Sequence, residues 1–225
     1  MNLNRLVSLI GEENVKKIRN LNILVLGLGG VGGYALESLV RCGINRITLV
    51  DGDVINHSNI NRQIIATRLN FNRYKTKEWR KRIRKINKDC NVTIINVMIT
   101  EDNIDLLFMQ KYDYIIDCCD STKVKVKLIK ECLERDIKLI SSMGTANKID
   151  ATKVQITTLD KTEYDPLAKR IRREIKNKED MKKIVVVSST EKAINNLVLG
   201  STSYVPATAG LFITNYIVND VVKKM

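Results

Sequence analysis

The sequence predicts an α/β fold with a doubly wound, mostly parallel sheet and helices on both of its faces. Short apolar runs alternate with stretches of helical spacing over residues 21–142, and the first run leads into a glycine-rich loop. Such alternation builds parallel sheets with right-handed crossovers. The 225 residues suffice for one domain, and two prolines and eleven glycines argue against a linker or a repetitive chain.

The expected elements follow one another in a regular order. Residues 3–19 have helical spacing in two short pieces, separated by Gly11, and are expected to cap the core. A strand over 21–26, a helix over 34–40 and a strand over 47–50 form the first strand–helix–strand unit. The alternation continues with helices near 76–88, 103–109 and 122–134 and strands over 92–97, 112–117 and 138–142. This is the order of a Rossmann-like sheet.

The pattern changes after residue 150. We expect an additional C-terminal region with a strand over 153–157, a basic helix near 167–178, a strand over 183–188 and a final helix near 206–224.

The charge of the chain points to an anionic partner. The sequence has 38 Lys and Arg against 25 Asp and Glu, a net charge of +13. Residues 73–88 hold nine basic residues and one acidic residue, and residues 169–183 hold eight and three, so these two segments account for the whole surplus. Basic runs of this kind are often solvated helix faces, but their concentration favours a polyanion.

The cysteines indicate a reducing compartment. Five cysteines form an odd set without a repeated CxxC spacing, so neither a disulfide framework nor a zinc ribbon is predicted. The most apolar long run, residues 205–218, contains Thr and Asn and is shorter than the roughly 18 apolar residues of a spanning helix. We therefore expect a cytoplasmic protein without stable membrane association.

The glycine-rich loop predicts a nucleotide site. The first strand runs into Gly27-Leu28-Gly29-Gly30-Val31-Gly32, which has the spacing G-x-G-x-x-G. Glycines here let the backbone turn and approach a phosphate, whose charge meets the free amides of the next helix. Asp51 ends the second strand, where it can accept hydrogen bonds from a ribose. These features fit a dinucleotide and a mononucleotide equally, and we expect the binding glycines to be Gly27, Gly29, Gly30 and Gly32.

The residues after Asp51 favour a triphosphate. Asp53, Asn59 and Arg62 follow in the loop, and Lys75 comes thirteen residues after Arg62. A triphosphate attacked at its α-phosphorus needs more cationic groups than a bridging pyrophosphate does. Taken singly, Arg62 could be a loop cation and Lys75 a solvated lysine, but their order after the glycine loop favours a phosphate site.

Two further polar residues follow the fourth strand of the chain. Asp120 and Ser121 come after Asp117-Cys118-Cys119, at the sheet edge where ligands bind in such folds. Carboxylate oxygens there suit magnesium, for which Asp120 is the candidate ligand. The alternative for either residue is the N-cap of the next helix. Cys118 and Cys119 are more typical of small buried strand residues than of nucleophiles.

With these residues, the sequence resembles the ubiquitin-activating-enzyme superfamily in its prokaryotic form, the ThiF, MoeB and HesA group of adenylating enzymes. The resemblance implies ATP and Mg²⁺ as cofactors, with the glycine loop under the nucleotide. It further implies Asp51 on the ribose, Asn59, Arg62 and Lys75 on the phosphates, Asp120 on magnesium and Ser121 beside the nucleotide. We expect a symmetric homodimer, because such dimers are the commonest assembly and the apolar C-terminal helix offers surface to bury. The resemblance implies that Arg5, before Leu9-Ile10-Gly11-Glu12, acts on the ATP of the other protomer. The implied catalytic residues are Arg62, Lys75, Asp120 and Arg5.

The second half of the chain resembles one family in particular, the tRNA threonylcarbamoyladenosine dehydratases. The similarity lies in residues 153–157, 159–162, 165–172, 189–191, 200–201, 205–206 and 209–211. It implies ATP-dependent dehydration, a cyclisation, of threonylcarbamoyladenosine in tRNA through a carboxyl-adenylate. The implied partners are tRNA, a second copy of the chain and a cysteine desulfurase and sulfur-acceptor system.

Residues 1–225 are then expected to form a single ThiF-type adenylation domain. Residues 1–20 would be its N-terminal helical segment, 21–145 its nucleotide-binding half and 146–225 its substrate and dimer half. The main alternative is an adenylyltransferase that activates the C-terminus of a ubiquitin-like sulfur-carrier protein, although the paired CxxC motifs of many such enzymes are missing. A nucleotide-binding oxidoreductase and a non-enzymatic binding module are the alternatives from other classes.

Overall fold

The computed structural model of the chain describes residues 1–195 and 198–222. Within these ranges seven strands form one sheet in the order β3–β2–β1–β4–β5–β7–β6. The strands are β1 (Asn22–Leu26), β2 (Arg46–Val50), β3 (Asn91–Ile95), β4 (Tyr114–Asp117), β5 (Leu139–Ser142), β6 (Val154–Thr158) and β7 (Val185–Ser189). All neighbouring pairs are parallel except β6 with β7. The predicted doubly wound α/β sheet is confirmed.

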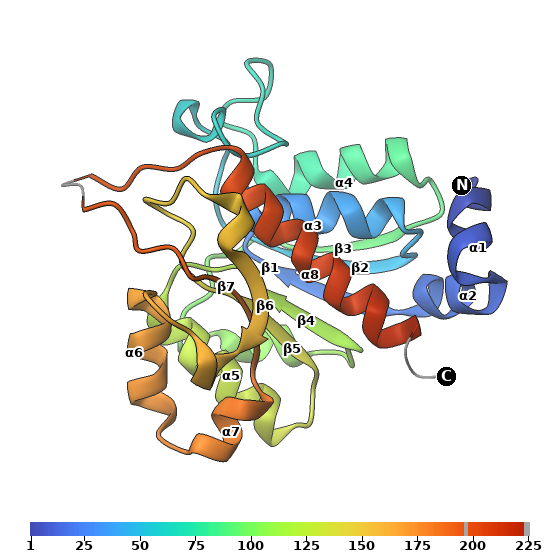
Figure 1. Cartoon of the computed structure of the whole chain (residues 1–225). Helices are drawn as coiled ribbons and strands as arrows, with labels where there is room; N and C mark the ends of the chain where they lie inside the picture. Colours follow the sequence, from blue (N-terminus) through green and yellow to red (C-terminus); the bar gives the residue numbers. More distant parts are fainter. Residues whose placement is uncertain (196–197, 223–225) are drawn as a thin grey trace.

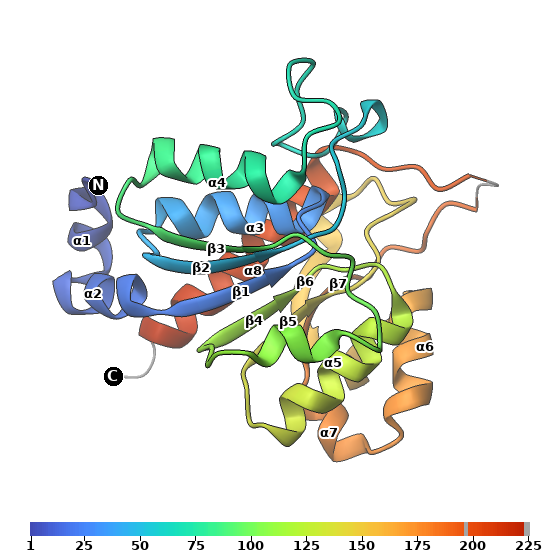
Figure 2. The ribbon, with the colours of Figure 1, turned by 180° about the vertical axis from the view of Figure 1, so that it is seen from behind.

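Helices cover both faces of the sheet (Figure 1). One face carries α3 (Gly30–Arg41), α4 (Lys75–Ile86) and α8 (Tyr204–Val222); the other carries α5 (Thr122–Glu134), α6 (Pro166–Ile175) and α7 (Lys178–Lys183). Figure 2 shows α1 (Asn4–Ile10) and α2 (Glu12–Asn20) beside the amino ends of the central strands. The loops that follow the strands therefore meet at the opposite edge of the sheet.

The central strands are apolar on both sides because both faces are covered. In β1, Ile23 and Val25 belong to the core beneath α3 and α8, whereas Leu24 and Leu26 belong to the core beneath α5. Successive side chains of a strand point to opposite faces, so a strand between two helical layers reads as one continuous apolar run. This is why the predicted strands were recognisable by their composition.

Helix α8 packs closely along α3. A Cβ atom at Gly210 would lie 2.4 Å from the carbonyl oxygen of Val31, so only glycine permits this approach. Thr214 donates to the carbonyl oxygen of Ala35 at 3.1 Å. No helix in the described part of the chain combines the length and apolar character that crossing a membrane requires.

Three expected elements differ from the structure. The segment 103–109 contains a 3₁₀ helix, Ile104–Phe108, rather than an α-helix. The basic helix predicted to reach residue 178 ends at Ile175, because Lys176 adopts a left-handed conformation with φ 52° and Asn177 caps a separate helix, α7. The last strand therefore begins at Val185 rather than 183. The predicted end of the final helix, residue 224, lies outside the described residues.

Candidate active site

A pocket of about 1200 Å³ lies at the carboxyl edge of the sheet. It spans four adjacent strands in the order β2, β1, β4 and β5, which lead into Asp51, Gly27, Cys118 and Met143 respectively. Neighbouring strands are about 4.8 Å apart, so the two ends of this row are separated by roughly 14 Å. The pocket is an elongated groove with a different chemistry at each strand.

The glycine loop forms the floor of the pocket beside β1. Gly27 has φ 84°, and a Cβ atom there would lie 2.7 Å from the carbonyl oxygen of Cys118. A Cβ atom at Gly32 would lie 1.9 Å from the carbonyl oxygen of Gly27, so the first turn of α3 packs directly on the loop. Gly27, Gly29 and Gly30 line the pocket, whereas Gly32 does not. Glycine thus permits the tight turn at residue 27 and the close packing of α3 at residue 32. At residues 29 and 30 the absence of a side chain lets a ligand approach the backbone.

Asp51 and Lys75 form a buried charged group at the β2 end. The Asp51 carboxylate accepts the backbone N–H groups of Leu28 and Asp53, each at 2.8 Å. Lys75, the first residue of α4, lies 2.7 Å from Asp53 and 3.6 Å from Asp51, and only 5% of it is exposed. The alternative of a solvated lysine at a helix start is therefore wrong. All three charged side chains line the pocket.

The loop after β2 brings the predicted residues Asn59 and Arg62 and the neighbouring Gln63 to the pocket. Asn59 is buried, and its side-chain oxygen accepts the N–H of Asn56 at 3.0 Å. Half-buried Arg62 donates to the carbonyl oxygen of Ser58 at 2.7 Å, an arrangement that folds the guanidinium back over its own loop. Gln63 was not predicted: it is buried in the pocket wall, and its Oε1 has no hydrogen-bond partner in the described part of the chain. That oxygen offers an acceptor to a ligand.

Asp120 and Ser121 lie together at the β4 position of the pocket, and both are exposed. Ser121 is also the N-cap of α5, since its hydroxyl accepts the N–H of Val124 at 3.5 Å. The capping alternative therefore holds for Ser121, while Asp120 projects its carboxylate without that role. One exposed carboxylate beside a phosphate site suits a magnesium ion that arrives with a nucleotide. The described residues contain no cluster of three or more metal-ligating His, Cys, Asp or Glu side chains.

The two cysteines before Asp120 have unreactive thiols. Burial raises the pKa of Cys118 to about 12. Burial, together with the carboxylate of Asp117, also raises the pKa of the Cys119 thiol. The thiolate is the nucleophilic form, so both groups are poor nucleophiles at neutral pH.

A buried ion pair holds the end of β4, just before Asp120, in place. Lys125 lies 2.9 Å from Asp117, neither side chain is exposed, and Ser141 on the next strand donates to the same carboxylate at 2.7 Å. The other Asp117 oxygen accepts the N–H of Cys119 at 3.1 Å. The end of β4, which aims Asp120, is thereby fixed to both α5 and β5.

The end of β5, the loop that follows it and the second half of the chain together build the other wall of the pocket. Residues 142–146 after β5, Leu167 at the start of α6, residues 199–201 and Pro206 all line it. Residues 142–146 were not predicted as part of the site. A signal for them existed, because the carboxyl end of the strand over 138–142 must lie at the same edge as those of the other parallel strands.

Arg5 is not part of this pocket. It is exposed on α1, which lies at the amino ends of the strands (Figure 1), and it does not line the pocket. The structure thus does not bring Arg5 together with the other predicted site residues of its own chain, and its role at the ATP of another copy stays a prediction.

This fold and pocket define the ThiF family, and the chain belongs to it: the family pattern matches residues 1–223. Within that family it is a member of the tRNA threonylcarbamoyladenosine dehydratase group. It is 38% identical to the tRNA threonylcarbamoyladenosine dehydratase of Bacillus subtilis, a match that covers 95% of this chain and 92% of the relative. It is 40% identical to the dehydratase of Escherichia coli over 75% of this chain and 63% of the relative.

Solved structures agree with the sequence relatives. The crystal structure of the E. coli tRNA N6-threonylcarbamoyladenosine dehydratase in complex with ATP is 34% identical, covers 99% of this chain and 94% of that chain, and has a TM-score of 0.94. The AMP complex of the same enzyme has a TM-score of 0.93 over 98% of this chain and 94% of that chain, also at 34% identity. A yeast adenylyltransferase and sulfurtransferase is 31% identical over only 69% of this chain and 34% of its own length. The sulfur-carrier alternative is accordingly not favoured.

Proposed function

We propose that the protein is an ATP-dependent enzyme that dehydrates threonylcarbamoyladenosine in tRNA, closing it into a ring through a carboxyl-adenylate. The observation that carries this proposal is the composition of the pocket: a nucleotide half on β2, β1 and β4 is continuous with a wall from the dehydratase-like second half. The chain also matches a relative of that name over nearly its whole length.

The chemistry follows from the weakness of a carboxylate as an electrophile. An oxygen of the threonyl carboxylate attacks the α-phosphorus of ATP, and the bond to the departing pyrophosphate breaks. The neighbouring carbamoyl group then attacks the activated carbonyl carbon, and AMP leaves with the former carboxylate oxygen. The substrate loses the elements of water. Because the second nucleophile is tethered to the carbonyl, its effective concentration is high and no enzyme cysteine is needed.

The residues of the nucleotide half would bind and neutralise the triphosphate. The ammonium group of Lys75 would contact a phosphate oxygen in addition to, or in place of, Asp53. The guanidinium of Arg62 would turn away from the carbonyl oxygen of Ser58 and bind a second phosphate oxygen. Asp51 would bind the ribose, and Asn59 would help to hold the phosphates. Fixed charges of this kind stabilise the negative charge that develops as pyrophosphate leaves.

Magnesium would be held by Asp120 together with phosphate oxygens, and Ser121 would lie beside the nucleotide. When bound, the cation would supply charge neutralisation on the leaving pyrophosphate. Its donor set fits, because Mg²⁺ commonly takes one or two protein carboxylates plus phosphates and waters.

The tRNA would approach along the two basic helices. Lys75 at the start of α4 and Leu167 near the start of α6 both line the pocket, and the two helices run away from it on opposite faces of the sheet (Figure 2). A second cavity of about 500 Å³ lies between α6 and α7, and its cationic lining residues are Arg172, Arg173, Lys176, Lys178 and Lys182. A polyanion that inserts one nucleoside into the pocket would meet basic groups on either side.

The assembly we propose is a symmetric dimer in which Arg5 of one copy reaches the ATP of the other. Residues 21–145 would serve the nucleotide, and residues 146–225 would serve the tRNA substrate and the dimer contact. We further propose a cytoplasmic location, which the five free cysteines support. A cysteine desulfurase and sulfur-acceptor system would be a further partner of the same enzyme.

Exchange of labelled pyrophosphate into ATP tests the proposal. The protein should catalyse exchange only with tRNA that carries threonylcarbamoyladenosine, and not with unmodified tRNA or with a sulfur-carrier protein. Exchange that depends on the sulfur carrier would support the adenylyltransferase instead. No exchange with either substrate would favour an oxidoreductase or a binding module.

A further inference from the structure

The segment 143–150 leads from β5 into the second half of the chain and forms one wall of the pocket. Its first residues, Met143, Gly144, Thr145 and Ala146, line the pocket. Because β5 is the last of the four strands beneath the pocket, this wall lies at the end opposite Asp51. A nucleotide whose ribose is held by Asp51 therefore extends toward it, and the group to be adenylated must lie between the two.

Asp165 ties this wall to α6. One carboxylate oxygen of Asp165 accepts the N–H of Gly144 at 2.9 Å. The other oxygen caps α6 by accepting the N–H groups of Leu167 and Ala168 at 2.9 and 3.0 Å. A Cβ atom at Gly144 would lie 3.4 Å from the carboxylate, so the loop and Asp165 are in close contact. A single side chain thus sets the distance between the wall and the helix.

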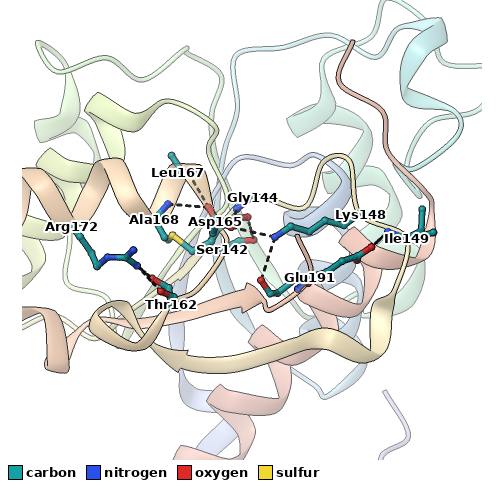
Figure 3. Close-up of polar contacts among 12 residues, drawn as sticks. Ser142, Gly144, Lys148, Ile149, Thr162, Asp165, Leu167, Ala168, Arg172 and Glu191 are labelled. Carbon is teal, nitrogen blue, oxygen red and sulfur yellow. Dashed lines mark hydrogen bonds and ion pairs between the residues drawn. The ribbon is translucent and has the colours of Figure 1, made fainter. Parts of the chain in front are cut away.

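Lys148, in the segment 143–150, pairs with Asp165. Only 2% of Lys148 is exposed, and its ammonium nitrogen lies 3.6 Å from Asp165 and 3.4 Å from the carbonyl oxygen of Ser189 (Figure 3). A buried charge is costly unless it is paired, so each member of this pair requires the other to stay in place. The pair links three elements: the wall, the start of α6 and the end of β7.

Two further contacts fix the rest of the segment. Glu191 accepts the N–H groups of Ile149 and Asp150, at 3.0 and 2.9 Å. Asn147, in a left-handed conformation with φ 57°, donates its N–H to the carbonyl oxygen of Gly200 at 2.9 Å and accepts the N–H of Gly200 at 2.6 Å. Every partner of the segment in these contacts belongs to the dehydratase-like stretches 165–172, 189–191 and 200–201.

We infer that Lys148 and Asp165 are positioning residues that hold residues 143–146 as the subsite for the threonylcarbamoyl group. This inference rests on the proposed function. Apart from the N–H of Gly144, at the boundary of the two halves, the partners described for the pair are Leu167, Ala168 and Ser189 of the second half, so the pair acts on the acceptor end of the pocket. Its loss should misplace the reacting carboxylate relative to the α-phosphorus without changing how ATP is bound.

The test compares three variants with a matched control. Lys148→Met removes the cation, Lys148→Arg keeps it, and Asp165→Asn removes the anion while leaving an oxygen that can still cap α6. The control is Glu37→Gln, which removes a buried anion on α3 that pairs with the more exposed Arg41 at 2.8 Å and Arg82 at 2.7 Å. For each variant, the affinity for ATP, the melting temperature, and kcat and KM for modified tRNA are measured well below the melting transition.

We expect kcat to fall about 100-fold in Lys148→Met and Asp165→Asn, the effect of a displacement of about 1 Å at a reacting group, with ATP affinity within about threefold of wild type. Lys148→Arg should recover most of the loss. Glu37→Gln should lower the melting temperature but leave kcat unchanged. If Lys148→Met does not fold, the inference is still tested by comparing kcat and ATP affinity of Asp165→Asn and Lys148→Arg with those of wild type.

The inference is wrong if Asp165→Asn retains wild-type kcat, or if ATP affinity falls in parallel with kcat. It is also wrong if Glu37→Gln loses kcat to the same extent at an equal loss of melting temperature. A wild-type protein that does not convert modified tRNA at all would refute the proposed function, and the inference with it. Conversion by wild type and by all variants alike would refute the inference alone.

Discussion

The ammonium group of Lys75 lies 2.7 Å from the carboxylate of Asp53, in a side chain that is almost completely buried at the pocket wall. A buried lysine at the start of a helix is held in place by its partners rather than by solvent. The phosphates of ATP would compete with Asp53 for this cation. The pair therefore makes Lys75 the clearest residue at which to test the phosphate site.

Lys75→Met should lower the rate of adenylate formation about 100- to 1000-fold, the range seen when one fixed charge-stabilising group is lost. The neighbouring exposed lysine on the same helix, Lys77, gives the matched control Lys77→Met, which should keep wild-type activity. Pyrophosphate exchange measured with saturating modified tRNA checks both variants. Equal exchange rates for Lys75→Met and Lys77→Met would show that Lys75 does not act in the phosphate site.

Asp120→Asn should raise the magnesium concentration needed for half-maximal activity, because one of the cation's few protein ligands becomes neutral. Part of the lost activity should return at high magnesium. The exposed carboxylate of Asp102 lies outside the pocket lining, so Asp102→Asn should leave the magnesium dependence unchanged. A titration of activity against magnesium that is identical for Asp120→Asn and wild type would assign Asp120 no part in metal binding.

The basic helices are tested by the salt dependence of tRNA binding. Replacing Arg80 and Arg84 on α4, or Arg170 and Arg173 on α6, with Gln should weaken binding and flatten the plot of log K against log salt by roughly 0.7 to 0.9 per lost contact. ATP affinity should not change. Because the two helices cover opposite faces, the two double variants show which face the RNA follows. Slopes equal to that of wild type in both double variants would show that these basic residues face solvent and do not contact tRNA.

Arg5 is tested by mixing two inactive variants. If Arg5 acts on the ATP of the partner, a heterodimer of Arg5→Ala and Arg62→Ala chains contains one site with both arginines intact. With random subunit exchange, half of the dimers are of this kind and half of their sites are complete, so activity should return to about a quarter of wild type. Absence of recovery after exchange has been verified would exclude action in trans.

The Lys125–Asp117 pair should matter for stability. Lys125→Met should reduce the free energy of unfolding by about 3–5 kcal/mol, because Asp117 would remain as an unpaired buried charge. The double variant Lys125→Met with Asp117→Leu should recover much of that loss. Burial lowers the pKa of Lys125, but Asp117 outweighs it and the pKa is raised above 10.5. The contribution of the Lys125 charge is therefore complete at neutral pH and is lost as the pH rises from the unfolded-state value of about 10.4 through the raised value, which denaturant unfolding at several alkaline pH values would show.

Much of the fold and of the nucleotide half could be predicted because their signals are local. Each central strand is an apolar run bounded by polar residues, and the glycine spacing 27–32 requires the turn and close packing that the structure shows. Parallel topology then brings Asp51 and Asp120 to one edge without any knowledge of side-chain contacts.

The remaining features depend on contacts between distant residues. The burial of Lys75 depends on Asp51 and Asp53, and the fixed position of residues 143–150 depends on Asp165 and Glu191. Neither relationship leaves a periodic pattern in the chain. The break between α6 and α7 was missed although a local signal existed, because Asn177 accepts the N–H groups of Glu179 and Asp180 as an N-cap residue does. No glycine or proline marks the end of α6.

The fate of a single oxygen atom tests the carboxyl-adenylate most directly. Modified tRNA whose threonyl carboxylate carries a heavy isotope in both oxygens is converted with unlabelled ATP, and the AMP product is analysed by mass spectrometry. The carboxyl-adenylate mechanism predicts one labelled oxygen in each AMP and none in pyrophosphate, with a cyclised nucleoside lighter by one water. Unlabelled AMP accompanying the cyclised nucleoside would contradict it.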